Sequence, residues 1–203
     1  FSFLGHNITS SIKFIDYGNF SETNEYGQEI GAFSAGEYVF SLGSNKQIGS
    51  FFHIGLNTKM AYSSLYELNS FSVLLDLSGS YFNPDNNIVA SILVKNIGYQ
   101  LDTYYDDNHE LLPFEILIGV SNKLEHMPLR WHLTFQHLET PNLDIAETQI
   151  NNSIYFGQNN FFNSILKHFV LGAEFLIHRN LTFLVGYNNR RRSEMILEER
   201  KAL

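Results

Sequence analysis

Apolar and polar residues alternate along most of this chain, which is the pattern of β-strands whose two faces meet different surroundings. Residues 51–63 show it most clearly. One face carries Phe52, Ile54, Leu56, Met60 and Tyr62, interrupted only by Thr58, and the other carries His53, Gly55, Asn57, Lys59 and Ala61. The pattern therefore predicts strands with one apolar and one polar face.

Nine strands are predicted in this way, and they cover residues 8–18, 31–43, 51–63, 70–82, 88–97, 114–123, 129–138, 167–176 and 181–189. Most are about ten residues long or longer, whereas strands of globular proteins average about five or six and a tilted strand needs about 9–11 to cross a bilayer. Residues 88–97 and 114–123 are apolar on both faces, so the alternation is weakest there.

The connections between these strands alternate as well. Short links rich in turn formers are predicted at 44–50, 83–87, 124–128 and 177–180, and mostly longer polar links at 19–30, 64–69, 98–113 and 139–166. This rotation is typical of an up-and-down barrel with tight turns at one membrane surface and longer loops at the other.

Charged residues within the strands favour the same fold. The polar faces carry Lys59, Asp76, Lys95, Glu115, Arg130 and Glu174. Such charges are costly in a sandwich core, but they can hydrate or pair in a wet barrel lumen. A soluble β-sandwich that turns them to solvent remains an alternative.

We therefore predict an all-β, transmembrane up-and-down antiparallel β-barrel. Bacterial barrels usually close with an even number of strands. Nine strands thus predict a single barrel domain over residues 1–203 that is incomplete at both ends.

Composition and motifs narrow the function classes. The net charge of −8, with one basic run at 190–192, excludes a nucleic-acid partner. The absence of cysteine excludes disulfides and thiolate metal sites. No phosphate-binding glycine loop, nucleophile elbow or zinc-binding helix pattern occurs. We expect binding or transport, with no enzymatic activity, cofactor or metal.

The longest predicted loop offers the candidate docking residues. Between Glu139 and Asn163 it carries Tyr155, Phe156, Phe161 and Phe162. Exposed aromatic side chains in a long polar loop often mark a partner site. The alternative is a loop that folds inward and packs as a plug.

Several stretches resemble the PorV/PorQ family of outer-membrane proteins. They are ASILVKNIGYQ (90–100), LPFEILIGVSNKLEHMPLRW (112–131), FVLGAEFLIHRNLTFLVGYN (169–188) and RRRSEM (190–195). GAFSAGEY (31–38) and KMAYSSL (59–65) are more similar to the PorQ branch. The resemblance covers nearly the whole chain, and its specificity lies in the ordered set because no single motif is unique.

The resemblance implies a barrel of about 14 strands related to the fatty-acid transporter (FadL-like) class. It also implies a place in the outer membrane of Bacteroidota, in the type IX secretion system. There the barrel would anchor the attachment complex that processes and attaches secreted cargo, with PorZ-like, PorU-like and PorV-like surface proteins and membrane lipids as partners. No family binding residue maps onto this chain.

A second function stays open, namely transport of hydrophobic small molecules as in the FadL-like class. Val89, Leu93 and Leu117 favour it, because they place apolar side chains on the expected inner face.

Overall fold

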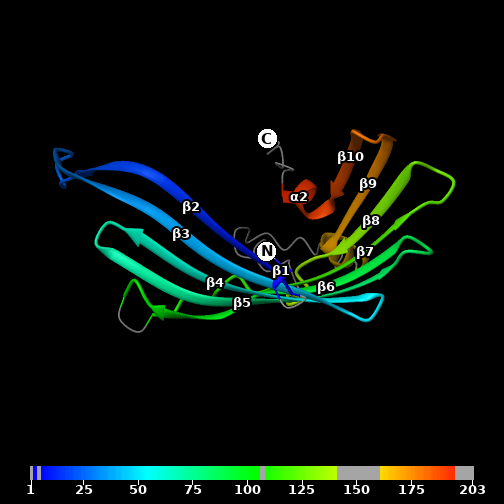
Figure 1. Cartoon of the computed structure of the whole chain (residues 1–203). Coiled ribbons are helices and arrows are strands. Elements are labelled where there is room, and N and C mark those ends of the chain that lie inside the picture. The colour runs from blue at the N-terminus through cyan, green and yellow to red at the C-terminus, as the bar shows by residue number, and fades with distance from the viewer. Residues whose placement is uncertain (1, 4–5, 106–107, 141–160, 195–203) are drawn as a thin grey trace, which may run out of the picture. The chain divides into compact units, whose positions relative to one another are not determined.

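The computed structural model describes residues 2–3, 6–105, 108–140 and 161–194, and most of them lie in strands (Figure 1). The strands are β1 (Ser2–Phe3), β2 (His6–Thr23), β3 (Glu29–Ile48), β4 (Phe52–Leu65), β5 (Leu68–Asn83), β6 (Ile88–Asp102), β7 (Glu115–Lys123), β8 (Leu129–Phe135), β9 (Phe169–His178) and β10 (Leu181–Asn188). Two short helices are α1 (Phe161–His168) and α2 (Asn189–Glu194). The all-β class and all nine predicted strands are confirmed, and β1 is additional.

The strands form one sheet in which neighbours in the chain are neighbours in space. The order runs from β1 to β10 without a crossover, and β1 and β10 are its two edge strands. The pairs from β1 to β4 and from β7 to β10 are antiparallel. The predicted up-and-down order is therefore confirmed, in a sheet that is not closed.

The chain divides into two compact units. The first comprises Phe1–Gly79 and Val94–Phe114, and the second comprises Ser80–Leu93 and Glu115–Leu203. The first unit contains the longest strands, β2 with 18 residues and β3 with 20. In the second unit, β7, β8 and β10 have 9, 7 and 8 residues.

The predicted alternation of short and long links is only partly right. Residues 64–69 were expected to be a longer loop, but β4 continues to Leu65 and β5 starts at Leu68. Tyr66 adopts a positive φ of 58°, which lets two residues reverse the chain. The links at 103–114 and 136–168 are long, as predicted.

The link between β2 and β3 is also shorter than predicted, because the residues at both of its predicted ends belong to the strands. Residues 19–23 belong to β2 and residues 29–30 to β3. The Asn24 side chain closes the remaining turn, since its Oδ1 accepts hydrogen bonds from the backbone N–H of Tyr26 at 3.0 Å and of Gln28 at 2.9 Å. Asparagine is a common turn former for this reason.

A β-bulge explains the weak alternation in β6. Asn96 has a φ of 59°, which marks an extra residue in the strand. Before it, the exposed large apolar residue is Ile92 on the even positions, and after it the exposed large apolar residues are Ile97, Tyr99 and Leu101 on the odd positions. The phase of the pattern changes by one residue, so one regular period cannot fit the whole strand.

The link between β8 and β9 ends in a helix where the sequence analysis predicted a loop up to residue 166 and strand from 167. Helix α1 covers Phe161–His168, and β9 starts directly after it at Phe169. The end of α1 is fixed to the end of β8. The backbone N–H of Gln136 donates to the His168 carbonyl at 2.9 Å, and the His168 Nδ1–H donates to the Gln136 carbonyl at 2.8 Å.

Candidate functional site

In β4 the apolar face is exposed and the polar face is protected, which is the reverse of the arrangement in a soluble protein. The apolar residues Phe52 and Met60 are 56% and 51% exposed. The alternating positions His53, Asn57 and Lys59 are half-buried. The apolar and polar sets are those predicted, and the polar set lies on the more protected side.

The same inversion holds on the neighbouring strands β3 and β5, whereas β2 and β10 are exposed on both faces. Only two apolar residues, Ala35 and Leu74, are buried in the described part of the chain. The buried polar or charged residues are Ser70, Ser72, Asp76, Gln100 and His168. In soluble domains the fully buried positions are mostly apolar. From β3 to β5 the polar face is therefore the more protected one, and it is the candidate functional surface.

Asp76 on β5 is the centre of a polar network in the first unit. Its carboxylate is 2.6 Å from Lys59 Nζ at one oxygen and 2.8 Å at the other. Its Oδ2 accepts a hydrogen bond from Asn57 Nδ2 at 3.0 Å, and its Oδ1 accepts one from the backbone N–H of Asn96 at 2.9 Å. Three neighbouring strands thus meet at one carboxylate, which is what a buried charge requires.

The bulge at Asn96 provides two hydrogen-bonding groups to this network. It turns a backbone N–H of β6 toward Asp76 and lets the Asn96 Oδ1 accept a hydrogen bond from Lys59 Nζ at 3.0 Å. The Asn96 amide also donates to the carbonyl of Pro113 at 2.7 Å. Two residues further on, a Cβ at Gly98 would clash with the backbone carbonyl oxygen of Val73, so only glycine fits the close approach of β6 to β5.

A second buried network continues along β6. The amide of Gln100, a residue 4% exposed, donates to Ser70 Oγ at 2.7 Å, and Ser70 Oγ donates to the carbonyl of Asp102. The Gln100 Oε1 accepts a hydrogen bond from the backbone N–H of Glu110 at 2.7 Å. Side chains of β6 therefore hold the 103–114 link where regular strand pairing has stopped.

The second unit has an ion pair of its own. Arg130 Nη1 on β8 donates to Glu174 Oε2 on β9 at 3.1 Å. His132 Nε2 lies 3.0 Å from the other oxygen of Glu174 but makes no hydrogen bond. Arg130 and Glu174 are register partners on neighbouring strands, and both lie on the polar face on which they were predicted.

Histidine 137 lies just beyond β8, between two carboxylates. Its Nδ1 is 3.2 Å from Glu139 Oε1, and its Nε2 is 3.9 Å from Glu115 Oε1. Burial acts to raise the pKa of Glu139, but hydrogen bonds from the backbone N–H of Ile116, from its own backbone and from His137 outweigh it and lower that pKa. His137 has a φ of 57°, so the regular strand geometry of β8 does not extend this far.

The predicted docking residues fall at the margin of the described chain. Tyr155 and Phe156 lie outside the described residues. Phe161 and Phe162 are the first two residues of α1. Their role in docking stays a prediction.

Sequence reasoning identified the charged members of the polar face but missed its amides. Asn57 was placed on the correct face without a role, and the functions of Asn96 and Gln100 were not foreseen. The only signal was the weak alternation around Asn96, which is where the bulge lies.

In the described residues, no group of three or more His, Cys, Asp or Glu side chains could hold a metal ion. The helices described are all too short or too polar to cross a membrane. Comparison of the chain with models of known protein families finds no match, and comparison with curated proteins finds none either.

Proposed function

We propose that this chain is part of an outer-membrane β-barrel that docks surface proteins of a type IX secretion system, as a component of the attachment complex that processes and attaches secreted cargo. The observation that carries the membrane part of the proposal is the inverted exposure of the sheet. On β3, β4 and β5 the apolar face is exposed and the polar face is protected, which is the arrangement that lipid outside and water inside require.

The exposed face has the character of a lipid-facing surface. On β3 and β4 it presents Tyr38, Phe40, Leu42, Ile54, Leu56 and Met60, all more than two-fifths exposed. Apolar patches of this extent are rare on soluble monomers. Thr58, the one polar residue in the β4 set, donates its hydroxyl to the Leu42 carbonyl at 3.1 Å, so its polar group is satisfied within the sheet.

The polar face supports a lumen. Charged residues there are paired within the sheet, Lys59 with Asp76 and Arg130 with Glu174. A soluble β-sandwich would reverse both faces, with the apolar one inward. This alternative would need a second layer to cover the apolar face, and no such layer is present among the described residues.

The role in secretion rests on the sequence resemblance to the PorV/PorQ family. The proposal assigns the barrel to anchoring and docking, with PorZ-like, PorU-like and PorV-like proteins as partners. No residue of the described chain is proposed to act in catalysis.

The test is affinity purification of the full-length protein from its own detergent-solubilised membranes. Recovery of a surface protein of the attachment complex in near-equal amounts is the expected result. A protein that remains in the aqueous fraction when membranes are washed at high pH would overturn the membrane assignment. A barrel that extracts alone would overturn the docking role.

A specific observation supports transport of hydrophobic small molecules as the second candidate. Val89, Leu93 and Leu117 are half-buried and share strand parity with the polar face. The second unit therefore has an apolar stretch on that face. Fatty acid or lipid in the purified barrel, without a protein partner, would favour this candidate.

A further inference from the structure

The β2–β3 hairpin is much longer than a membrane crossing requires. At about 3.3 Å per residue, 18 to 20 residues extend roughly 60 Å, whereas about 9–11 tilted residues cross a bilayer. β4 stops at Leu65, which pairs with Ala35 of β3. Beyond that pair β2 and β3 continue alone, and Figure 1 shows this part of the hairpin extending past the end of β4. We call residues 18–34 the projecting ribbon.

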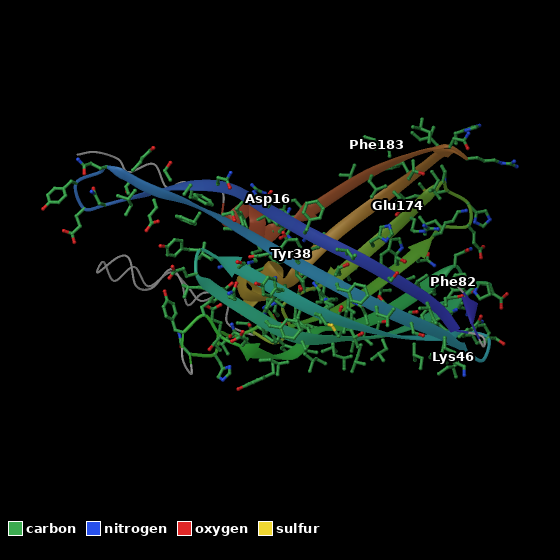
Figure 2. All side chains as sticks on the ribbon, turned by 60° about the vertical axis from the view of Figure 1, so that its left-hand side comes forward. Asp16, Tyr38, Lys46, Phe82, Glu174 and Phe183 are labelled. Carbon is green, nitrogen blue, oxygen red and sulfur yellow. The ribbon has the colours of Figure 1, made fainter. Side chains whose placement is uncertain are left out.

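The ribbon begins at a defined bend. Gly18 has a φ of 82°, and the pairing of β2 with β3 shifts register between Asp16 and Gly18. Asp16 Oδ1 accepts a hydrogen bond from the Gly18 backbone N–H at 2.8 Å, which fixes this bulge. Figure 2 labels Asp16 on β2 and Lys46 toward the opposite end of the hairpin. Bulges bend a strand and increase its twist, so the ribbon is set off from the rest of the sheet.

The ribbon is suited to water and not to lipid. Beyond Ser34, whose carbonyl accepts a hydrogen bond from the Tyr66 N–H, no strand pairs with the outer edge of either ribbon strand in the described structure, and unpaired backbone groups are costly in hydrocarbon. The ribbon also carries Glu22, Glu25 and Glu29. The exposed carboxylates of Glu25 and Glu29 lie at the turn end.

Although two-stranded hairpins are usually marginal, this one is braced at its base. Phe20 stacks on Phe33 with ring centroids 5.3 Å apart, and Phe33 meets Tyr66 edge to face at 5.2 Å. Tyr66 lies in the β4–β5 link, and its hydroxyl donates to Glu22 Oε1 at 3.0 Å. The ribbon is therefore held in one conformation before any partner binds, which lowers the entropy cost of binding.

The negative charge of the ribbon indicates which kind of partner it would bind. Between Lys13 and Lys46 the chain has no Lys, Arg or His, and its carboxylates are Asp16, Glu22, Glu25, Glu29 and Glu37. Exposed apolar side chains accompany them: Tyr26 is 87% exposed and Ile30 is 61% exposed. Tyrosine is enriched at protein interfaces, and complementary charge speeds and orients docking.

We propose that the projecting ribbon is the docking surface for an exported protein whose contact surface is rich in Lys and Arg. The proposal rests on the docking function above and names the surface and its chemistry. A second copy of this chain is disfavoured as the occupant because two acidic ribbons repel each other.

The test uses the full-length protein in detergent, with the surface protein that co-purifies with the wild type as the probe. The double variant Glu25→Lys, Glu29→Lys should weaken binding of this probe about tenfold or more, because two attractive contacts become repulsive. Raising the salt concentration to about 0.5 M should weaken the wild-type complex, since the screening length shortens. The matched control is Asp85→Lys, Glu125→Lys, which changes the charge equally in exposed links of the second unit.

Three results of this binding test would each overturn a specific part of the proposals. Normal binding by the Glu25→Lys, Glu29→Lys variant would overturn the ribbon as the docking surface and leave the docking function intact. If no surface protein co-purifies with the wild type, the docking function fails first and the ribbon proposal with it. Equal losses in both double variants would assign the effect to net charge and overturn the ribbon proposal.

A photo-crosslinking residue at Tyr26 provides a measurement that does not depend on charge. It should form a covalent link to the same probe protein. The same crosslinking residue introduced in place of Met127, which is 54% exposed in the second unit, should form none. A crosslink from Tyr26 to a second copy of this chain would replace the proposed partner with self-association and overturn the proposal.

Discussion

The two units of this chain each place an ion pair on the polar face, but they use it differently. In the first unit, the side chains of Lys59 and Asp76 are 19% and 10% exposed, and Asp76 is also hydrogen-bonded to Asn57 and Asn96. In the second, the side chains of Arg130 and Glu174 are 40% and 18% exposed. One pair is built into the sheet, and the other retains access to water. Their contributions to stability should differ accordingly.

Removing the buried carboxylate should have the largest effect. Asp76→Ala leaves Lys59 and the Asn96 N–H without their acceptor, and breaking such a buried pair costs about 3–5 kcal/mol. We expect a loss of this size in the free energy of unfolding, measured by urea titration of the barrel in lipid vesicles. Lys59→Met combined with Asp76→Leu should cost less than the sum of the two single changes. A loss near 1 kcal/mol for Asp76→Ala would remove the contrast between the units.

The next test compares the two faces within the first unit. Met60→Arg puts a charge on the exposed apolar face, where the cost near the bilayer centre is about 2–4 kcal/mol. Ser78→Arg puts the same charge at an exposed position with the strand parity of Asp76 on the polar face. We expect the Met60→Arg barrel to unfold at clearly lower urea concentration. Equal effects of the two variants would argue against lipid on the apolar side.

A smaller loss is expected in the second unit. Glu174→Gln removes the negative charge that pairs with Arg130, but the guanidinium is exposed enough to hydrate, so the change should cost about 1 kcal/mol. Urea titration measures it, and Arg130→Met supplies the companion variant for a double-mutant cycle. A loss as large as that for Asp76→Ala would mean that the two ion pairs are equivalent.

The smallest expected effect depends on pH and concerns Glu139. Its pKa is lowered in the folded chain, so the ionised carboxylate stabilises the fold at neutral pH. This contribution is lost as the pH falls through the lowered pKa. Glu139→Gln should therefore lower the urea midpoint at neutral pH, and the difference from the wild type should shrink in acid. A difference that stays constant with pH would exclude the carboxylate as its source.

The strands and their two faces could be predicted from the sequence because the alternation of apolar and polar residues within a strand reflects the surroundings of each face. In β4 every second residue faced the same way, as expected, and Lys59 and Asp76 were placed on the polar face. Which side of the sheet would be protected could not be decided from alternation, since sandwiches alternate too.

The errors came from single residues that change the backbone. Tyr66 and Asn96 have positive φ values, at 58° and 59°, and they are not glycines. One shortened a link and the other shifted the phase of a strand. Helix α1 was missed because its first six residues were assigned to the polar loop before them and its last two to the following strand. The Asp76 network needed three strands in register, which no local pattern contains.

The strand order has a consequence for how the sheet can form. Because every strand pairs with its neighbour in the chain, each new strand can add to an existing edge after a small loop closure. Most links contain five residues or fewer, and loop-closure entropy is small for them. The 136–168 link is the largest closure, at the step from β8 to β9. Local pairings favour fast folding, so we expect this step to be the slowest strand addition in the assembly of the sheet.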